Sequence, residues 1–470
     1  MAGLFDTLAL GSRSLTTYRK AIDTTGHNLS NVHTPGYTRQ RLEIESTTVD
    51  GGTQGAIGTG SDSVRVMRLQ NEFAERQIQV EVSVEGSLST RQETLEQALT
   101  SLQETINRSG ANGTSTNGIS QGLSEFFNAA QGLTTDPDSI PDRQVLLQKA
   151  QELATKFNTV DGRLASLTGA VNEQIQSEVE KVNSLATEIS SLNRAIVSEE
   201  ALSDGYANDL RDSRQAKMEE LSKLVKIETT EQADGSMNIS VAGNLLVDGR
   251  DVVNTLETFT PAGFDPADGH LMVRVTGQAD ALALTGGSIE GAISVREGQL
   301  TTLRTEINTL AETLISEVNL AHSTGFGLTG TTGANFFTGT NASDIAVNAA
   351  LLREPALLQA SAASGEAGDN TIARAIAELE NKAHAALDGQ TFSGKQAQTV
   401  AWLGQEVSNA RAELQDQATI SQFIRQQRDS VSGVSVDEEM TNLVMFQKAF
   451  QASAKLISMT DEMLATLIEM

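Results

Sequence analysis

The two ends of the sequence each repeat apolar residues at every seventh position. The repeat consists of Leu8, Leu15, Ile22 and Leu29 near the N-terminus and of Val436, Leu443, Phe450, Ile457 and Leu464 near the C-terminus. Such a repeat places an apolar stripe along one side of a helix, where a second helix packs. Two matching stripes at opposite ends predict an out-and-back chain whose terminal helices lie against each other.

Sequence breaks separate both terminal segments from the rest of the chain. The segment 34–37 ends the first helix, because Pro35 at its second position and Gly36 at its third fit a type II turn. Gly433 ends a long helical pattern, and Ser435 with Glu438 predicts a capping box at the start of the last helix. Isolated helices of this kind are marginal in water. We therefore expect the ends to be poorly ordered in the monomer and to fold against neighbouring copies.

Helical periodicity dominates the region between the two ends. Prolines are absent from residues 36–136 and 356–470, which permits long helices there. Helical patterns cover about 70–108, 142–200, 291–321 and 394–431. Glycine and small polar residues predict flexible loops at 51–60 and 109–118. Between 225 and 290 the apolar period shortens to two, and Asp234-Gly235 predicts a hairpin turn.

These patterns together predict a mainly α protein. We expect an elongated rod of long helices, coiled-coil-like terminal helices and a small inserted β-rich module. Residues 1–50 with 431–470 would form a terminal helical assembly domain, and residues 51–224 with 291–430 a helical rod domain. Residues 225–290 would form the β-rich module.

The charge and the residue composition exclude several kinds of partner. The chain has 61 acidic and 34 basic residues, so its formal charge is −27, and nucleic acids or anionic membranes would repel it. No run approaches the ~18 apolar residues that membrane insertion needs. With no cysteine, the chain has no disulfide, thiolate zinc site or cysteine nucleophile. Its first residues lack the basic and apolar regions of a signal peptide.

The sequence shows no convincing catalytic or cofactor motif. Residues 389–395 nearly match a phosphate-binding loop, but Gln396 stands where the Mg²⁺-binding hydroxyl is required. His27 and His33 are six positions apart, which places them on different faces of a helix. We therefore predict no enzyme activity, no cofactor and no metal site.

Two motifs, one at each end, resemble those of a known family. Residues 28–40, which include Asn28, Asn31 and Tyr37, resemble the N-terminal signature of the bacterial flagellar axial proteins (rod, hook and hook-associated proteins). Residues 446–457 resemble the C-terminal signature. The interior segments are similar to the hook-associated protein 1 (FlgK-type) members, and they are 208–214, 220–225, 317–326 and 430–439. The similarity spans essentially the whole chain.

One interior segment departs from the longer family members. Phe336-Phe337 is followed almost at once by residues 341–345, near the place where longer relatives have an additional outer domain. The chain therefore resembles a reduced version.

The resemblance implies a structural adaptor that forms the hook–filament junction of the extracellular flagellum. It also implies secretion through the flagellar type III export channel without a cleaved signal peptide. The implied partners are further copies of the chain, the hook protein, hook-associated protein 3 and an export chaperone that binds the C-terminal region.

Three other functions compete with this interpretation. Another axial component, hook or distal rod, is the nearest alternative, but residues 325–326 and 336–337 argue against it. An enzyme carried on an axial scaffold would need a catalytic motif within 225–345, where we find none. A free-standing helical effector or adhesin would not require both terminal signatures.

The terminal signatures and stripes predict the assembly interface. Its expected residues are Leu8, Leu15, Ile22, Asn28, Leu29, Asn31, Pro35, Gly36, Tyr37, Leu443, Phe446, Phe450, Ile457 and Leu464. The sequence is also rich in methionine near the C-terminus, at Met440, Met445, Met459, Met463 and Met470. These residues fit either ordinary packing between helices or an adaptable apolar face that meets more than one partner.

Overall fold

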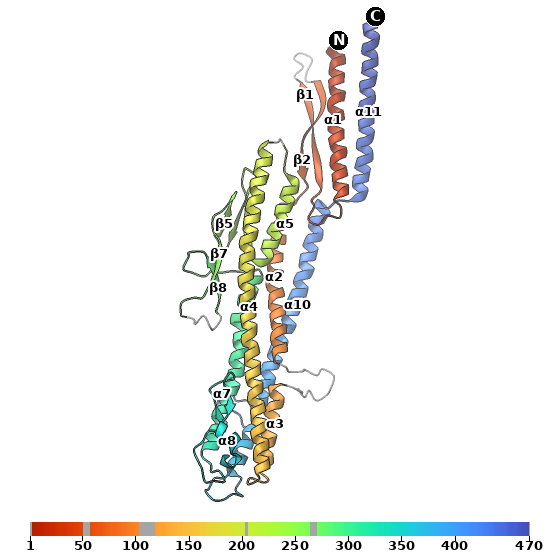
Figure 1. Ribbon diagram of the computed structural model, residues 1–470. Coiled ribbons are helices and arrows are strands. Elements are labelled where there is room, and N and C mark those ends of the chain that lie inside the picture. Colours follow the sequence, from red (N-terminus) through yellow and green to blue (C-terminus); the bar gives the residue numbers. More distant parts are fainter. Residues whose placement is uncertain (1, 50–56, 103–117, 203–204, 264–269, 470) are drawn as a thin grey trace.

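The computed structural model describes residues 2–49, 57–102, 118–202, 205–263 and 270–469. It is an elongated and mainly helical molecule (Figure 1). The first helix, α1 (Ala2–Ser30), and the last, α11 (Val436–Glu469), lie side by side, so both termini are at one end of the molecule. The mainly α fold and the pair of terminal helices are confirmed.

A long antiparallel hairpin packs along α1. It is formed by β1 (Gln40–Val49) and β2 (Ile57–Arg68). The prediction of a flexible loop over 51–60 is wrong at Gly58 and Gly60, which belong to β2; residues 50–56 lie outside the described part of the chain. A Cβ atom at Gly60 would lie 2.5 Å from Leu10 Cδ1, so this glycine permits close packing of β2 on α1. We refer to α1, β1, β2 and α11 together as the terminal unit.

Long helices form the rod that continues from the terminal unit. The principal ones are α2 (Glu72–Ser101), α3 (Ile119–Leu133), α4 (Ile140–Leu202), α5 (Asn208–Leu224), α6 (Ser288–Val295), α7 (Thr301–Ser323) and α10 (Phe392–Ser432). A π-helical turn (Arg296–Leu300) joins α6 to α7. The predicted long helices are confirmed where they are described, whereas α3 and α5 are helices that were not predicted. The predicted loop at 109–118 lies outside the described residues except for Gly118.

The rod has a continuous apolar core that ends in an aromatic cluster. The cluster lies at the end of the rod remote from the termini, beside the short helices α8 (Ala349–Arg353) and α9 (Thr371–Glu378). Its phenylalanines, all fully buried, are Phe126, Phe127, Phe336, Phe337 and Phe392. Their ring centroids lie 4.8 to 5.9 Å apart, which is the favourable range for aromatic packing.

The β-rich module lies against the side of α4 (Figure 1). Its first sheet is an antiparallel meander of β3 (Ile227–Glu231), β4 (Met237–Val241), β5 (Asn244–Asp248) and β6 (Asp251–Val252). A second sheet pairs β7 (Leu256–Phe259) with β8 (Met272–Val275), and β9 (Phe337–Thr338) pairs with β10 (Ala346–Val347) near the aromatic cluster. The predicted β-rich segment is confirmed, and Gly235 has the positive φ of 81° that its turn requires.

Candidate functional site

The motifs from the two ends of the chain meet at the base of the terminal unit, where Asn28 is buried. Its Nδ2 donates hydrogen bonds to Glu439 Oε2 (3.0 Å) and to the carbonyl oxygen of Gln40 (2.8 Å). Its Oδ1 accepts from the backbone N–H of Gln40 (2.9 Å) and from the hydroxyl of Tyr37 (2.8 Å). One fully bonded carboxamide therefore joins α1, β1 and α11, and a buried group of this kind specifies a unique arrangement.

Arg39 links the same point to both sides of the α10–α11 junction. Its Nε donates to Glu439 Oε1 (2.8 Å), and its Nη1 donates to Glu438 Oε2 (2.7 Å). The backbone N–H of Arg39 donates to the carbonyl oxygen of Ser432, at the end of α10 (2.9 Å). Helix α11 begins at Val436, so Ser435 stands at the predicted N-cap position, and the carboxylate of Glu438 accepts from Arg39.

The predicted turn after α1 is present and positions Tyr37. Gly36 has a φ of 78°, and the backbone N–H of Tyr37 donates to the carbonyl oxygen of Thr34 (3.2 Å), as in a type II turn. Burial and the nearby carboxylates, first that of Asp209, raise the pKa of the Tyr37 hydroxyl above its usual range, so it stays a neutral donor. Pro35 and Gly36 are the two central residues of this turn, and the hydrogen bonds that the structure describes for Asn31 lie within residues 27–34.

The first turns of α5 hold the terminal unit on the rod. The carboxylate of Asp212 accepts from the backbone N–H of Thr38 (2.9 Å) and from Arg68 Nη1 (2.7 Å). Asp209 Oδ1 accepts from Gln40 Nε2 (2.9 Å). Asn208 Nδ2 donates to a β2 carbonyl oxygen (3.1 Å). We call this network the latch: Asn28, Tyr37, Arg39, Gln40, Arg68, Asn208, Asp209, Asp212, Glu438 and Glu439.

The sequence signals for the latch were incomplete. The motif at 208–214 was visible, but its pairing with the N-terminal signature was not, because Thr38 and Asp212 are 174 positions apart. Glu439 is 411 positions from Asn28 and lies one residue after the predicted capping box. Neither separation has a periodic signature in the sequence.

Above the latch, α1 and α11 pack along the predicted stripes. A Cβ atom at Gly11 would lie 2.6 Å from Ile457 Cγ1, so the two helices approach closely there. Val436, the first residue of the C-terminal stripe, is 43% exposed. The other stripe residues and Phe446 are only half-buried, and they are Leu8, Leu15, Ile22, Leu29, Leu443, Phe446, Phe450, Ile457 and Leu464. The most buried positions of α1 are small or polar and include Thr17, Ala21 and Asn28, since Thr17 lies against the hairpin, at Ser61.

The rest of α11 presents an exposed apolar face. Its side chains are about half exposed, and they are Met440, Val444, Met445, Met459, Met463 and Leu467. These methionines are therefore only partly covered within the chain, and Met459 and Met463 lie beside Leu4 of α1. Met470 lies outside the described residues.

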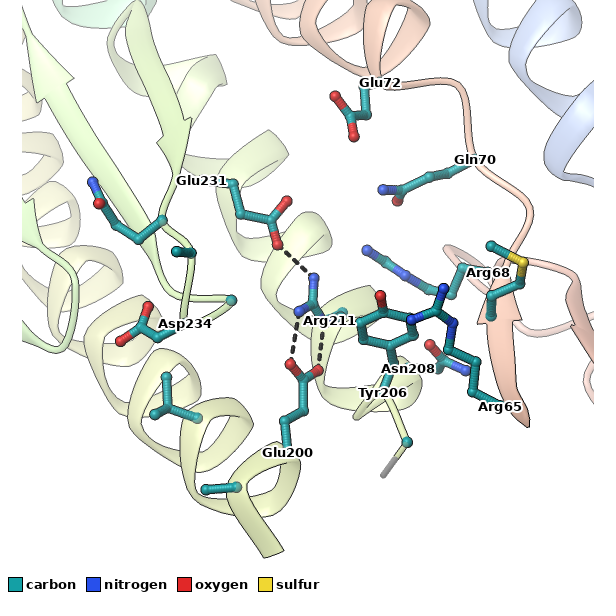
Figure 2. A pocket seen from close by; sticks show the side chains of 17 residues that line it. Arg65, Arg68, Gln70, Glu72, Glu200, Tyr206, Asn208, Arg211, Glu231 and Asp234 are labelled. Carbon is teal, nitrogen blue, oxygen red and sulfur yellow. Dashed lines mark hydrogen bonds and ion pairs between the residues drawn. The ribbon is translucent and has the colours of Figure 1, made fainter. Parts of the chain in front are cut away.

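A cleft of about 800 Å³ separates the hairpin from the top of the rod (Figure 2). In the cleft Arg211 is paired with Glu200 (Nε–Oε1, 2.6 Å) and with Glu231 (Nη1–Oε1, 2.5 Å). The guanidinium carbons of Arg65 and Arg211 lie 5.3 and 5.2 Å from the ring centroid of Tyr206. These contacts are structural pairs and do not arrange a nucleophile beside a base.

The other candidate sites also have structural contacts. The phosphate-loop-like segment is the start of α10, where Lys395 pairs with Glu306 (2.7 Å) and Asp388 (2.8 Å). Within the described residues, no group of three or more His, Asp or Glu side chains is placed to hold a metal ion. Among the helices whose residues are described, none is sufficiently long and apolar to span a membrane.

Comparison with known proteins gives consistent matches over the whole chain. Residues 109–337 match the family model of the flagellar hook-associated protein FlgK helical domain, and residues 425–470 match that of the flagellar basal body rod FlgEFG protein C-terminal region. The chain is 25% identical to flagellar hook-associated protein 1 of Bacillus subtilis, covering 100% of the chain and 98% of the relative. It is 23% identical to the Escherichia coli protein of that name, with 97% of each covered.

A solved structure has the same fold. The flagellar hook junction protein FlgK from Burkholderia pseudomallei matches with a TM-score of 0.63 and 16% identity. The match covers 76% of this chain and 100% of the solved one.

Proposed function

This chain belongs to the family of flagellar hook-associated protein 1 (FlgK), and from that premise we propose that it builds the hook–filament junction by self-assembly through its terminal unit. Its relatives are named as hook-associated proteins, and the matched structure as a hook junction protein. A hook or distal-rod role is not favoured, because the FlgK helical-domain model matches 109–337.

The observation that carries the assembly mechanism is the exposed apolar face of α11. One side of α11 is covered by α1, while Met445, Met459 and Met463 on the remaining surface are about half exposed. A continuous apolar surface of this kind marks an interface. Contacts between unlike surfaces of neighbouring copies generate rings or helical assemblies, which is the kind of structure that a junction requires.

The predicted interface residues divide into two roles in this proposal. Asn28, Gly36 and Tyr37 hold the base of the terminal unit through the latch, with Asn31 and Pro35 shaping the turn. The half-buried stripe residues of α1 and α11 become fully covered when neighbouring copies assemble. The terminal segments would then gain order on assembly, because helices with half-covered stripes are only marginally stable alone.

The family premise also supports the partners and the route. We propose the hook protein and hook-associated protein 3 as neighbours in the flagellum, and an export chaperone that covers the C-terminal region before assembly. Export would use the flagellar type III channel and leave the N-terminus uncut. The exposed apolar side chains of α11 are the surface that such a chaperone would protect.

Electron microscopy of cells that lack the chain tests the proposed function. We expect bare hooks without filaments and flagellin released into the medium. Absent or malformed hooks would identify a hook or rod component instead. Normal filaments would contradict a junction role.

Complementation with surface variants tests the role of α11. The double variant Met459→Asp and Met463→Asp should fail to restore filaments, because it charges the exposed face. Val253→Asp is the matched control, since Val253 is similarly exposed on the β-rich module. Restoration of filaments by the double variant would refute assembly through this face.

A further inference from the structure

The terminal unit and the rod share no apolar core. Among the described residues, the buried apolar clusters of the rod contain no side chain of α1, β1, β2 or α11. Two short covalent connections join the parts, at 69–71 and 433–435. Their relative orientation therefore depends on polar contacts, which are directional and do not act through a large packed surface.

Asp212 occupies a special position among those contacts. Its two carboxylate oxygens bind both strands at the open end of the hairpin, where Gln40 pairs with Arg68: Oδ2 accepts from the N–H of Thr38, just before β1, and Oδ1 accepts from Arg68, the last residue of β2. The side chains of Asp212 and Arg68 are each 9% exposed. If a buried carboxylate loses one of these donors, the cost of removing its charge from water is no longer offset. Asp212 therefore fixes the base of the hairpin.

The helix that carries Asp212 is itself anchored firmly in the rod. Arg214, which is 2% exposed, donates to Asn193 Oδ1 on α4 (2.8 Å) and to the carbonyl oxygen of Gly235 in the β-rich module (2.7 Å). Arg211 is paired with Glu200 of α4 and Glu231 of β3. Asp212 is thus presented from a rigid support.

Beside this contact, the cleft leaves room for movement. Arg65 and Arg68 of the hairpin line one side of it, and Glu200, Tyr206 and Arg211 of the rod line the other (Figure 2). Arg65 over the ring of Tyr206 bridges the two sides. Because Arg65 and Tyr206 are about 40% exposed, this contact is weaker than the buried bonds of Asp212.

We propose that Asp212 is the positioning residue of a hinge between the terminal unit and the rod. Its carboxylate sets the angle between the two parts, and the cleft is the space into which the hairpin swings when the ion pair between Asp212 and Arg68 is broken. The connections at 69–71 and 433–435 are the axis of this motion. Both parts keep their internal structure, because neither contributes side chains to the other's core.

A distance measurement on the full-length chain tests the hinge. The chain has no cysteine, so Arg19→Cys on α1 and Ser198→Cys on α4, both exposed, give two unique spin-label sites. We expect one narrow distance distribution in this parent. Asp212→Asn and Arg68→Gln should each shift it and broaden it roughly twofold, since either one removes the ion pair.

Glu220→Gln is the matched control for these variants. Glu220 is on α5 and forms an exposed ion pair with Lys181, so its loss should leave the distribution unchanged. Circular dichroism and thermal melting verify that the rod is intact. If Asp212→Asn unfolds α5, Arg68→Gln decides the question, because Arg68 lies outside the rod core.

Two results would overturn the hinge. One is a parent distribution as broad as that of the variants, which would mean that Asp212 does not fix the angle. The other is an unchanged distribution in both Asp212→Asn and Arg68→Gln. Either result leaves the junction function untouched, because the measurement uses a single unassembled chain.

Discussion

The two ends of this molecule are stabilised in different ways. The end remote from the termini has a dry aromatic cluster whose members, such as Phe126 and Phe336, are fully buried. The terminal unit has half-buried stripes, an exposed methionine face and a buried polar latch. The first end is buried within one chain, whereas the second exposes apolar side chains such as Met445 and Met463. A subunit of an assembly needs both a part with a buried core of its own and a part with exposed apolar surface for its neighbours.

The largest expected effect is the loss of an aromatic side chain from the remote end. Phe126→Ala should lower the free energy of unfolding of the rod by about 3–5 kcal/mol, because it leaves a cavity among packed rings. Chemical denaturation of the full chain measures this loss. Phe423→Ala, at a site 65% exposed on α10, is the control and should change stability by less than about 0.5 kcal/mol. If both variants lowered the free energy of unfolding equally, the remote end would not depend on its buried aromatic cluster.

Acid should also weaken the remote end. Burial lowers the pKa of His322 to about 4, below the value of about 6.5 in an unfolded chain. The neutral form is therefore favoured in the fold, and its contribution is complete above pH 6.5 and is lost as the pH falls toward 4. The loss amounts to at most about 3 kcal/mol.

His322→Gln isolates this effect from the titration of carboxylates. The difference in unfolding free energy between wild type and variant should shrink as the pH falls from 6.5 to 4. A difference that stays constant over this range would show that His322 is not the acid-sensitive group.

A smaller effect should appear in the terminal unit alone. Asn28→Ala removes four hydrogen bonds and leaves Glu439 with one donor fewer, at a cost of about 1–3 kcal/mol. Hydrogen exchange should show faster exchange in α1 and α11 and unchanged protection in α4. Asn128→Ala, in a helix of the rod and at an exposed hydrogen bond, should alter neither. Loss of protection throughout the rod would contradict the separation of the two parts.

The smallest effect on the monomer is expected at Phe450. This side chain is in the middle of the C-terminal stripe and is half-buried. Phe450→Ala should hardly change the melting temperature of the isolated chain but should impair assembly into the flagellum. A large drop in the melting temperature would show that the stripe is already fully used within one molecule.

Sequence patterns predicted the local structure better than the contacts between distant segments. The heptad stripes predicted α1 and α11, the proline-free regions permitted α2 and α10, helical periodicity predicted α4, and alternation predicted the β-rich module. The glycines of β2 were misleading, because Gly60 is required for close approach to Leu10 and not for flexibility. The apolar residues of α3 recur at helical spacing, at Ile119, Leu123, Phe126, Ala130 and Leu133, so its sequence carried a helical signal that the prediction missed.

The latch was the hardest feature to predict. Its donors and acceptors are single polar residues, and a single polar residue has no period. Asp212 could have been assigned to the surface of α5 as readily as to the hairpin. Only the folded arrangement shows that the N-terminal signature and the 208–214 motif are two halves of one contact.

Because α4 is long, a small tilt at the latch would move the far end of the rod by a large distance. With 63 residues and a rise of 1.5 Å per residue, this helix is about 95 Å long, and its C-terminal end lies beside the cleft. In the proposed hinge it would act as a lever arm: a tilt of about 10° at the base of the hairpin would displace the distant aromatic end by roughly 16 Å. A movement smaller than one side chain near Asp212 would thus be amplified into a displacement wider than a helix at the far end.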